Sequence, residues 1–115
     1  MSNTEVRTEN AAGDASARKK TIVVDEGVVG HIGSWEQGGK RLVGFWVGRA
    51  FWGRGIATLA LSEFLKHELT RPLYAYVVAH NLGSLRVLEK CGFRRVGASS
   101  TEPDGVEEFL FQLDA

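Results

Sequence analysis

The stretch Trp-Gly-Arg-Gly-Ile-Ala at residues 52–57 constrains the fold of this chain more than any other. It follows an apolar run over residues 41–47 that predicts a strand, and it opens a helical pattern in which Ile56, Ala60 and Phe64 recur every four residues. The two glycines let the backbone turn sharply between strand and helix. The first N–H groups of a helix lack intrahelical partners and carry the positive end of its dipole. The stretch therefore predicts a binding site for a phosphate-like anion.

A chain of 115 residues is long enough for one domain with a modest core and too short for two. Its 14 Lys and Arg residues balance its 14 Asp and Glu residues, which gives no support for a nucleic-acid partner or an anionic membrane. Cys91 is the only cysteine, which excludes an intrachain disulfide and a cysteine metal cluster, and no metal site is predicted. No run is apolar enough for a signal peptide or a membrane span, so we expect a cytoplasmic protein.

Residues 1–20 are polar and charged, with almost no large aliphatic side chains, so we expect a disordered tail there and a folded domain over 21–115. Short β-branched and apolar runs separated by Gly-containing turns predict an antiparallel meander of three strands, at 21–25, 28–35 and 41–47. A helix over 56–69 and a strand over 73–79 follow. This strand should run parallel to the third strand, because a helix connects the two.

The remainder of the chain predicts a second helix and two further strands. Asn81 is a suitable N-cap for a helix over 82–91, and Gly92 is a suitable residue to end it. Strands are expected over 93–98 and 106–113. The predicted fold class is α+β, a mixed sheet with the element order β-β-β-α-β-α-β-β and a parallel βαβ crossover at its centre.

Taken alone, the glycine stretch permits more than one interpretation. It lacks the Gly-Lys-Ser/Thr ending of a nucleoside-triphosphate loop, and the antiparallel meander before it does not fit a dinucleotide fold. A tight strand-to-helix turn without a ligand is an alternative. The segment from Asn81 to Phe93 is likewise explained by helix chemistry alone, with a capping residue at each end.

Residues 47–57 and the segment 81–93 together resemble the Gcn5-related N-acetyltransferase (GNAT) superfamily, over roughly residues 21–113. The residues of the first motif look most like those of the branch that acetylates ribosomal-protein N-termini. The resemblance implies that acetyl-coenzyme A lies where the strand before the glycine stretch splays from the next parallel strand. The N–H groups of residues 53–57 would hold its pyrophosphate, and one near Val47 would bind the thioester carbonyl. The implied coenzyme contacts are Trp46, Val47, Trp52, Gly53, Arg54, Gly55, Ile56, Ala57, Asn81, Ser84 and Phe93.

The same resemblance implies departures among the catalytic residues. Leu88 stands where many members have a tyrosine that protonates the leaving thiolate, and Ser84 is a possible substitute acid. Leu42 stands near the position of an acidic residue in many relatives, so His31 and Glu36 become the candidates for a base. A structural role for His31 is the alternative. A base is not strictly required, because proximity in a dry site can supply much of the acceleration.

Complete domains of this family begin with a strand and two helices ahead of the strand expected at 21–25. Residues 1–20 are too short and too polar to replace them, so we expect a domain that lacks much of the acceptor half. The predicted function is transfer of an acetyl group from acetyl-coenzyme A to a primary amine of a small molecule or peptide, by direct attack. The alternative is a non-catalytic coenzyme-A-binding or interaction module completed by a partner chain. A homodimer, in which each subunit covers the other's open acceptor side, fits both.

Overall fold

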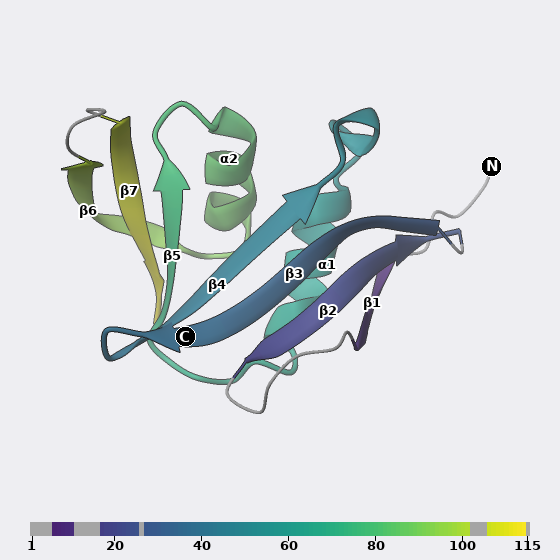
Figure 1. The fold of residues 1–115 in the computed structure, drawn as a ribbon, viewed down its shortest axis with the longest axis horizontal. Helices are drawn as coiled ribbons and strands as arrows, with labels where there is room; N and C mark the ends of the chain where they lie inside the picture. Colours follow the sequence, from purple (N-terminus) through teal and green to yellow (C-terminus); the bar gives the residue numbers. More distant parts are fainter. Residues whose placement is uncertain (1–5, 11–16, 26, 102–105, 115) are drawn as a thin grey trace.

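The computed structural model describes residues 6–10, 17–25, 27–101 and 106–114. Seven strands form one sheet, and two α-helices pack on one of its faces (Figure 1). In chain order the elements are β1 (Val6–Asn10), β2 (Arg18–Val24), β3 (Gly27–Gln37), β4 (Lys40–Val47), the 3-10 helix η1 (Arg49–Phe51), α1 (Ile56–Leu65), β5 (Leu73–Val78), α2 (Leu82–Lys90), β6 (Arg94–Thr101) and β7 (Val106–Leu113).

The strands lie in the order β1-β2-β3-β4-β5-β7-β6, and every neighbouring pair is antiparallel except β4 and β5. These two strands and α1 form the parallel crossover, with the helix behind the strands in Figure 1. The predicted α+β mixed sheet, its antiparallel meander and its central crossover are confirmed. The predicted strands agree with the structure to within a few residues, and β7 matches residues 106–113.

The expectation of a disordered tail is wrong for the parts of it that the structure describes. β1 pairs antiparallel with β2, so that Val6 lies opposite Val24. β2 begins at Arg18, earlier than the strand predicted from the sequence. Backbone pairing with β2 and packing of Val6 against the core offset the polar composition of β1. Residues 1–5 and 11–16 of the predicted tail lie outside the described residues.

β1 also corrects the expectation that the first strand is missing. It occupies one edge of the sheet beside β2, ahead of the meander. The connection from β1 to β2 consists of residues 11–17. Since one turn of α-helix already takes about 3.6 residues, two helices do not fit into this connection.

α1 is shorter than the helix predicted over 56–69. It begins where predicted and ends at Leu65. Beyond that residue, the N–H groups of His67 and Glu68 both donate to the carbonyl of Phe64, each at 3.0 Å. This turn carries the Glu68 side chain inward, where the residue is 1% exposed.

α2 has the caps that the sequence predicts at both ends. The Asn81 side-chain oxygen accepts a hydrogen bond from the Ser84 N–H at 3.2 Å. At the other end, Gly92 has a positive φ of 95°, and the Phe93 N–H donates to the Leu88 carbonyl at 3.0 Å. This is a Schellman ending, which needs a glycine at the left-handed position.

The two faces of the sheet differ in what covers them. Apolar side chains of both helices pack against the first face, around Ile32, Val43 and Ala75. The opposite face carries Trp35 and Trp46. No helix that the structure describes covers it, and we call it the open face. Within the described part of the chain, no helix has the length and apolar character needed to cross a bilayer.

Candidate functional site

β4 and β5 diverge toward their carboxyl ends. They are paired at Leu42 and Tyr74, near their beginnings, and separate from there toward Val47 and Val78 (Figure 1). The chain leaves β4 into η1 and α1, and it leaves β5 into α2, so two helix starts follow this splayed end. The space outside the carboxyl ends of diverging parallel strands is a recurrent ligand site in sheets of this kind.

The glycine stretch after β4 leaves its backbone N–H groups available. Gly53 and Gly55 have positive φ angles of 79° and 75°, and Gly55 is the N-cap of α1. A Cβ atom added at either glycine would meet nothing within 4 Å, so both positions face open space. No hydrogen bond joins the N–H groups of residues 53–58 to any other residue that the structure describes. The local geometry therefore has the properties predicted for an anion site.

Aromatic and cationic side chains surround this turn. The Trp52 indole N–H donates to the Val47 carbonyl at 2.7 Å, which ties the turn to the end of β4. The guanidinium of Arg49 lies 5.4 Å from the Trp52 ring centroid, and that of Arg54 lies 5.7 Å from the Phe51 ring centroid. Two positive charges thus stand beside the unpaired N–H groups, and both favour an anion there.

Some of the residues implied in coenzyme contact are buried in the core. Ile56 is 2% exposed, Val47 8% and Phe93 4%, and all three belong to the main apolar cluster. Ile56 and Val47 are therefore placed to contribute backbone groups. Phe93 packs inside the core, and Asn81 caps α2 through its side chain.

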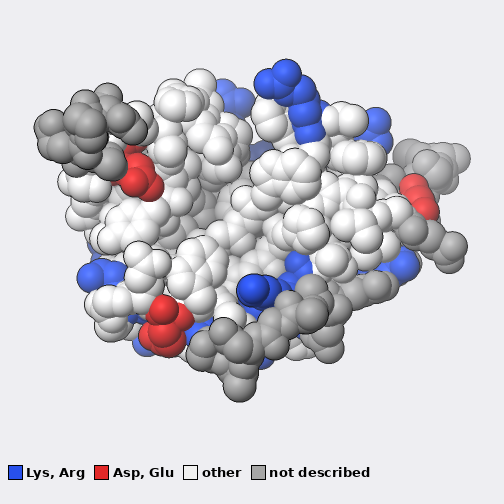
Figure 2. Space-filling model, viewed as in Figure 1, with Lys and Arg blue, Asp and Glu red and all other residues white. Residues whose placement is uncertain are grey.

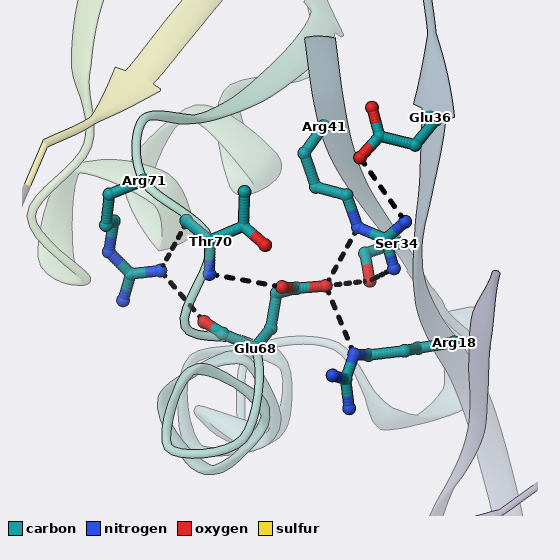
Figure 3. Close-up of polar contacts among 7 residues, drawn as sticks. All are labelled: Arg18, Ser34, Glu36, Arg41, Glu68, Thr70 and Arg71. Carbon is teal, nitrogen blue, oxygen red and sulfur yellow. Dashed lines mark hydrogen bonds and ion pairs between the residues drawn. The ribbon is translucent and has the colours of Figure 1, made fainter. Parts of the chain in front are cut away.

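The three candidate catalytic residues lie in different places. His31 lies on the open face opposite Trp46, and the two rings stack with centroids 6.1 Å apart. Ser84 lies in the first turn of α2. Glu36 faces Arg41 at 3.7 Å, beside the beginning of β4 (Figure 3). Arg41 and Val47 are six positions apart along β4, which corresponds to a distance of about 20 Å. The structure brings His31 to the splayed half of β4 and does not bring Glu36 there.

A buried polar cluster was missed by sequence reasoning. Glu68 turns under the sheet, and its carboxylate accepts hydrogen bonds from the Ser34 hydroxyl, from Arg41 Nε at 3.0 Å and from the Thr70 N–H at 3.3 Å (Figure 3). Arg18 Nε is 3.5 Å from the same carboxylate. Burial alone would raise the pKa of Glu68, but these hydrogen bonds outweigh it and lower the pKa to about 2. The cluster joins the turn after α1 to β2, β3 and β4 at the end opposite the splayed strands.

Cys91 is half-buried beside α1, with its Sγ 3.7 Å from the Thr58 carbonyl. Burial raises the pKa of this thiol, so the thiol form is favoured. Among the described residues, no three His, Cys, Asp or Glu side chains gather in a way that could hold a metal ion.

Diverging parallel strands, followed by a glycine turn with unpaired N–H groups, are an arrangement in which a helix start can accept an anionic ligand. Comparison with known proteins identifies the family. The acetyltransferase (GNAT) domain family matches residues 3–94, so this chain belongs to the GNAT acetyltransferase family. This confirms the family resemblance seen in the two motifs.

Similar proteins support the same assignment. The probable N-acetyltransferase YjcK of Bacillus subtilis (strain 168) is 41% identical over 59 residues, which cover 48% of this chain and 33% of that protein. RimJ of Mycobacterium smegmatis, solved with a coenzyme A disulfide, is 27% identical with a TM-score of 0.76, over 87% of this chain and 54% of its own. RimL, a ribosomal L7/L12 alpha-N-protein acetyltransferase solved with coenzyme A, has a TM-score of 0.76 at 16% identity, over 86% of this chain and 62% of its own. The chain thus spans a third of the curated relative and less than two thirds of these solved structures.

Proposed function

We propose that this chain binds acetyl-coenzyme A with the pyrophosphate on the N–H groups of residues 53–57. The observation that carries the proposal is the run of unpaired N–H groups at the start of α1, directly after the splayed end of β4. A hydrogen bond to a charged group is worth about 1.5–3 kcal/mol, so a few of them suffice to anchor the coenzyme. Solved relatives support binding of the coenzyme, since RimL and RimJ were solved with coenzyme A forms and the Microcin C7 self immunity acetyltransferase MccE with acetyl-CoA.

The proposed reaction is acetyl transfer to a primary amine without a covalent enzyme intermediate. The neutral amine attacks the thioester carbonyl carbon, a C–N bond forms, and the C–S bond breaks when the tetrahedral intermediate collapses. A backbone N–H near Trp46 or Val47 stabilises the oxyanion of that intermediate. The amine loses a proton and the departing thiolate gains one, with Ser84 as the candidate acid for the thiolate.

His31 is the candidate base that the geometry favours, because it lies beside Trp46 on the splayed half of β4. Substitution His31→Gln should then lower the turnover rate by roughly 10²-fold. Glu36→Gln is the matched control and should leave turnover unchanged, because Glu36 lies at the far end of the strand pair. Equal turnover in the His31→Gln and wild-type proteins would show that proximity alone drives the attack.

The alternative function is coenzyme binding without catalysis, as an interaction module that a partner chain completes. The short connection between β1 and β2 motivates it, because the two helices expected from the family resemblance do not fit there. Thiol release from acetyl-coenzyme A separates the two functions. The amine panel should include spermidine and N-terminal peptides, since solved relatives include a spermidine N-acetyltransferase and the L7/L12 enzyme. Amine-dependent thiol release supports the transferase, whereas coenzyme binding without release supports the module.

We also propose that two copies associate so that each covers the open face of the other. Trp35, Trp46 and Tyr76 are 38%, 60% and 45% exposed on that face. Exposed aromatic side chains that share one face of a sheet make that face a candidate site of interaction.

A further inference from the structure

A groove crosses the open face over β2, β3 and β4. Its volume is about 670 Å³, within the range of about 300–1,000 Å³ that small-molecule sites occupy. The groove lies beside the splayed half of β4, since Gly44 and Trp46 both line it. Figure 2, which looks onto this face, shows largely uncharged surface across its middle.

Paired glycines form the floor of the groove. Gly33 of β3 lies directly opposite Gly44 of β4, so neither strand places a side chain over the sheet at this point. A Cβ atom at Gly44 would lie 2.9 Å from the Trp35 ring, and one at Gly33 would lie 2.7 Å from the Arg18 carbonyl. Both positions therefore require glycine. The Trp35 ring already occupies the space over Gly44, so a flat group can approach the backbone at Gly33, which also lines the groove.

Aromatic rings form two walls of the groove. The Trp35 ring leans over Gly44 from one side. On the other side, His31 and Trp46 stack on each other. A slot between aromatic side chains favours a flat apolar or aromatic group, because such rings prefer stacked or edge-on neighbours.

The third wall supplies positive charge. β2 lines the far side of the groove, and Lys19 lies opposite Gly33, which places its side chain on the open face. Arg18 and Lys20 line the groove with their backbone only, because they pair with Ser34 and Ile32 and their side chains lie on the helix side of the sheet. No Asp or Glu is among the described lining residues. From β4 to β2 the sheet spans two strand spacings, about 10 Å.

We propose that the groove holds the acceptor, and that the acceptor is a small amine with a flat aromatic body and an acid group facing Lys19. The amine then reaches the splayed half of β4, the ring fills the slot between Trp35 and Trp46, and the acid group points across the sheet to β2. The groove disfavours polycationic acceptors such as polyamines, because its described lining brings the Lys19 cation and no carboxylate. This assignment rests on the proposed function, since it treats the amine as the acetyl acceptor.

Three probes test the assignment by calorimetry on the full chain, with and without coenzyme A. 4-(Aminomethyl)benzoate carries amine, ring and acid; 4-methylbenzylamine has the same amine and ring with a neutral methyl group; spermidine is a polycation without a ring. The benzoate should bind up to about fivefold more tightly than the methyl compound, the strength expected of one exposed ion pair. Spermidine should bind more weakly than both.

Two variants locate the binding. Lys19→Gln should reduce the affinity for the benzoate to that for the methyl compound. Lys66→Gln removes the same charge from an exposed position on the helix side and should change neither affinity. Trp35→Leu should weaken both aromatic probes alike.

The proposal is overturned if spermidine binds as tightly as the benzoate, if neither aromatic probe binds, or if Lys19→Gln leaves the preference intact. Thiol release measured in parallel tests the proposed function independently of the groove assignment. Release with spermidine and not with the benzoate contradicts the groove assignment and leaves the transferase standing. Aromatic probes that bind when coenzyme A does not would leave the groove standing and contradict the transferase.

Discussion

Glu68 is the residue whose environment departs furthest from what its neighbours in the sequence suggest. Its partners Ser34 and Arg41 lie 34 and 27 positions earlier in the chain. The helical pattern over residues 56–69 predicts that Glu68 is one of several solvated charged residues. Packing of the chain beyond α1 against the sheet buries it instead. Long-range partners of this kind leave no local signal in the sequence.

The depressed pKa of Glu68 makes stability depend on pH. Since the folded pKa is about 2 against an ordinary value of 4.5, the stabilisation is present above pH 4.5 and is lost as pH falls from there toward 2. The difference corresponds to about 3 kcal/mol. Urea denaturation followed from pH 7 to pH 2.5 should show this loss in the wild type and a much flatter profile for Glu68→Gln.

Glu63→Gln is the control for that series. Glu63 pairs with Lys66 on the surface at 3.0 Å, and exposed pairs contribute little to stability. Its pH profile should follow the wild type. A wild-type profile as flat as that of Glu68→Gln would mean that the buried cluster does not favour the charged carboxylate.

At the scale of elements, local chemistry predicts where α2 begins and ends. The capping roles of Asn81 and Gly92 are predicted correctly, because a cap depends on the residues within one turn. The sequence does not predict the end of α1 or the existence of β1, because each depends on pairing or packing with strands elsewhere in the chain. The order of apolar runs predicts the parallel crossover of β4 and β5, whereas the splay of these two strands is implied only by the family resemblance.

Gly83 in the first turn of α2 and Gly92 just beyond its end should respond to alanine in opposite directions. Gly92→Ala should destabilise the protein by about 1 kcal/mol or more, because its φ is 95°, a backbone conformation that L side chains rarely adopt. Gly83→Ala should stabilise by about 0.5–1 kcal/mol, since Gly83 lies in the first turn of the helix with space around it. Urea denaturation midpoints measure both. Equal effects would contradict the Schellman ending.

At the scale of the molecule, one covered and one open face distinguish this domain. The core lies between the sheet and the two helices, while Trp35, Trp46 and Tyr76 stay exposed on the other side. Residue periodicity predicts which side chains share a face. It does not show whether a face is covered, because that depends on which elements pack across it.

Association through the open face is testable by sedimentation equilibrium at micromolar concentration. The wild type should sediment as a dimer, and Tyr76→Glu should shift it toward the monomer, because a carboxylate would be buried in the contact. Leu69→Glu is the matched control on a residue 72% exposed beyond α1, and it should remain dimeric. A monomeric wild type would contradict the proposed association.

The central claim is that the glycine turn at the start of α1 binds the pyrophosphate of acetyl-coenzyme A. Calorimetric titration of the coenzyme into the wild type, Gly55→Ala and Gly55→Glu tests it most directly. Both variants place a side chain at the same positive φ of 75°, in open space, so they share the backbone strain and differ in charge. The wild type should bind, Gly55→Ala should bind more weakly, and Gly55→Glu should lose far more affinity because its carboxylate repels the pyrophosphate. Absence of binding to the wild type, or equal affinities in the two variants, would contradict the account.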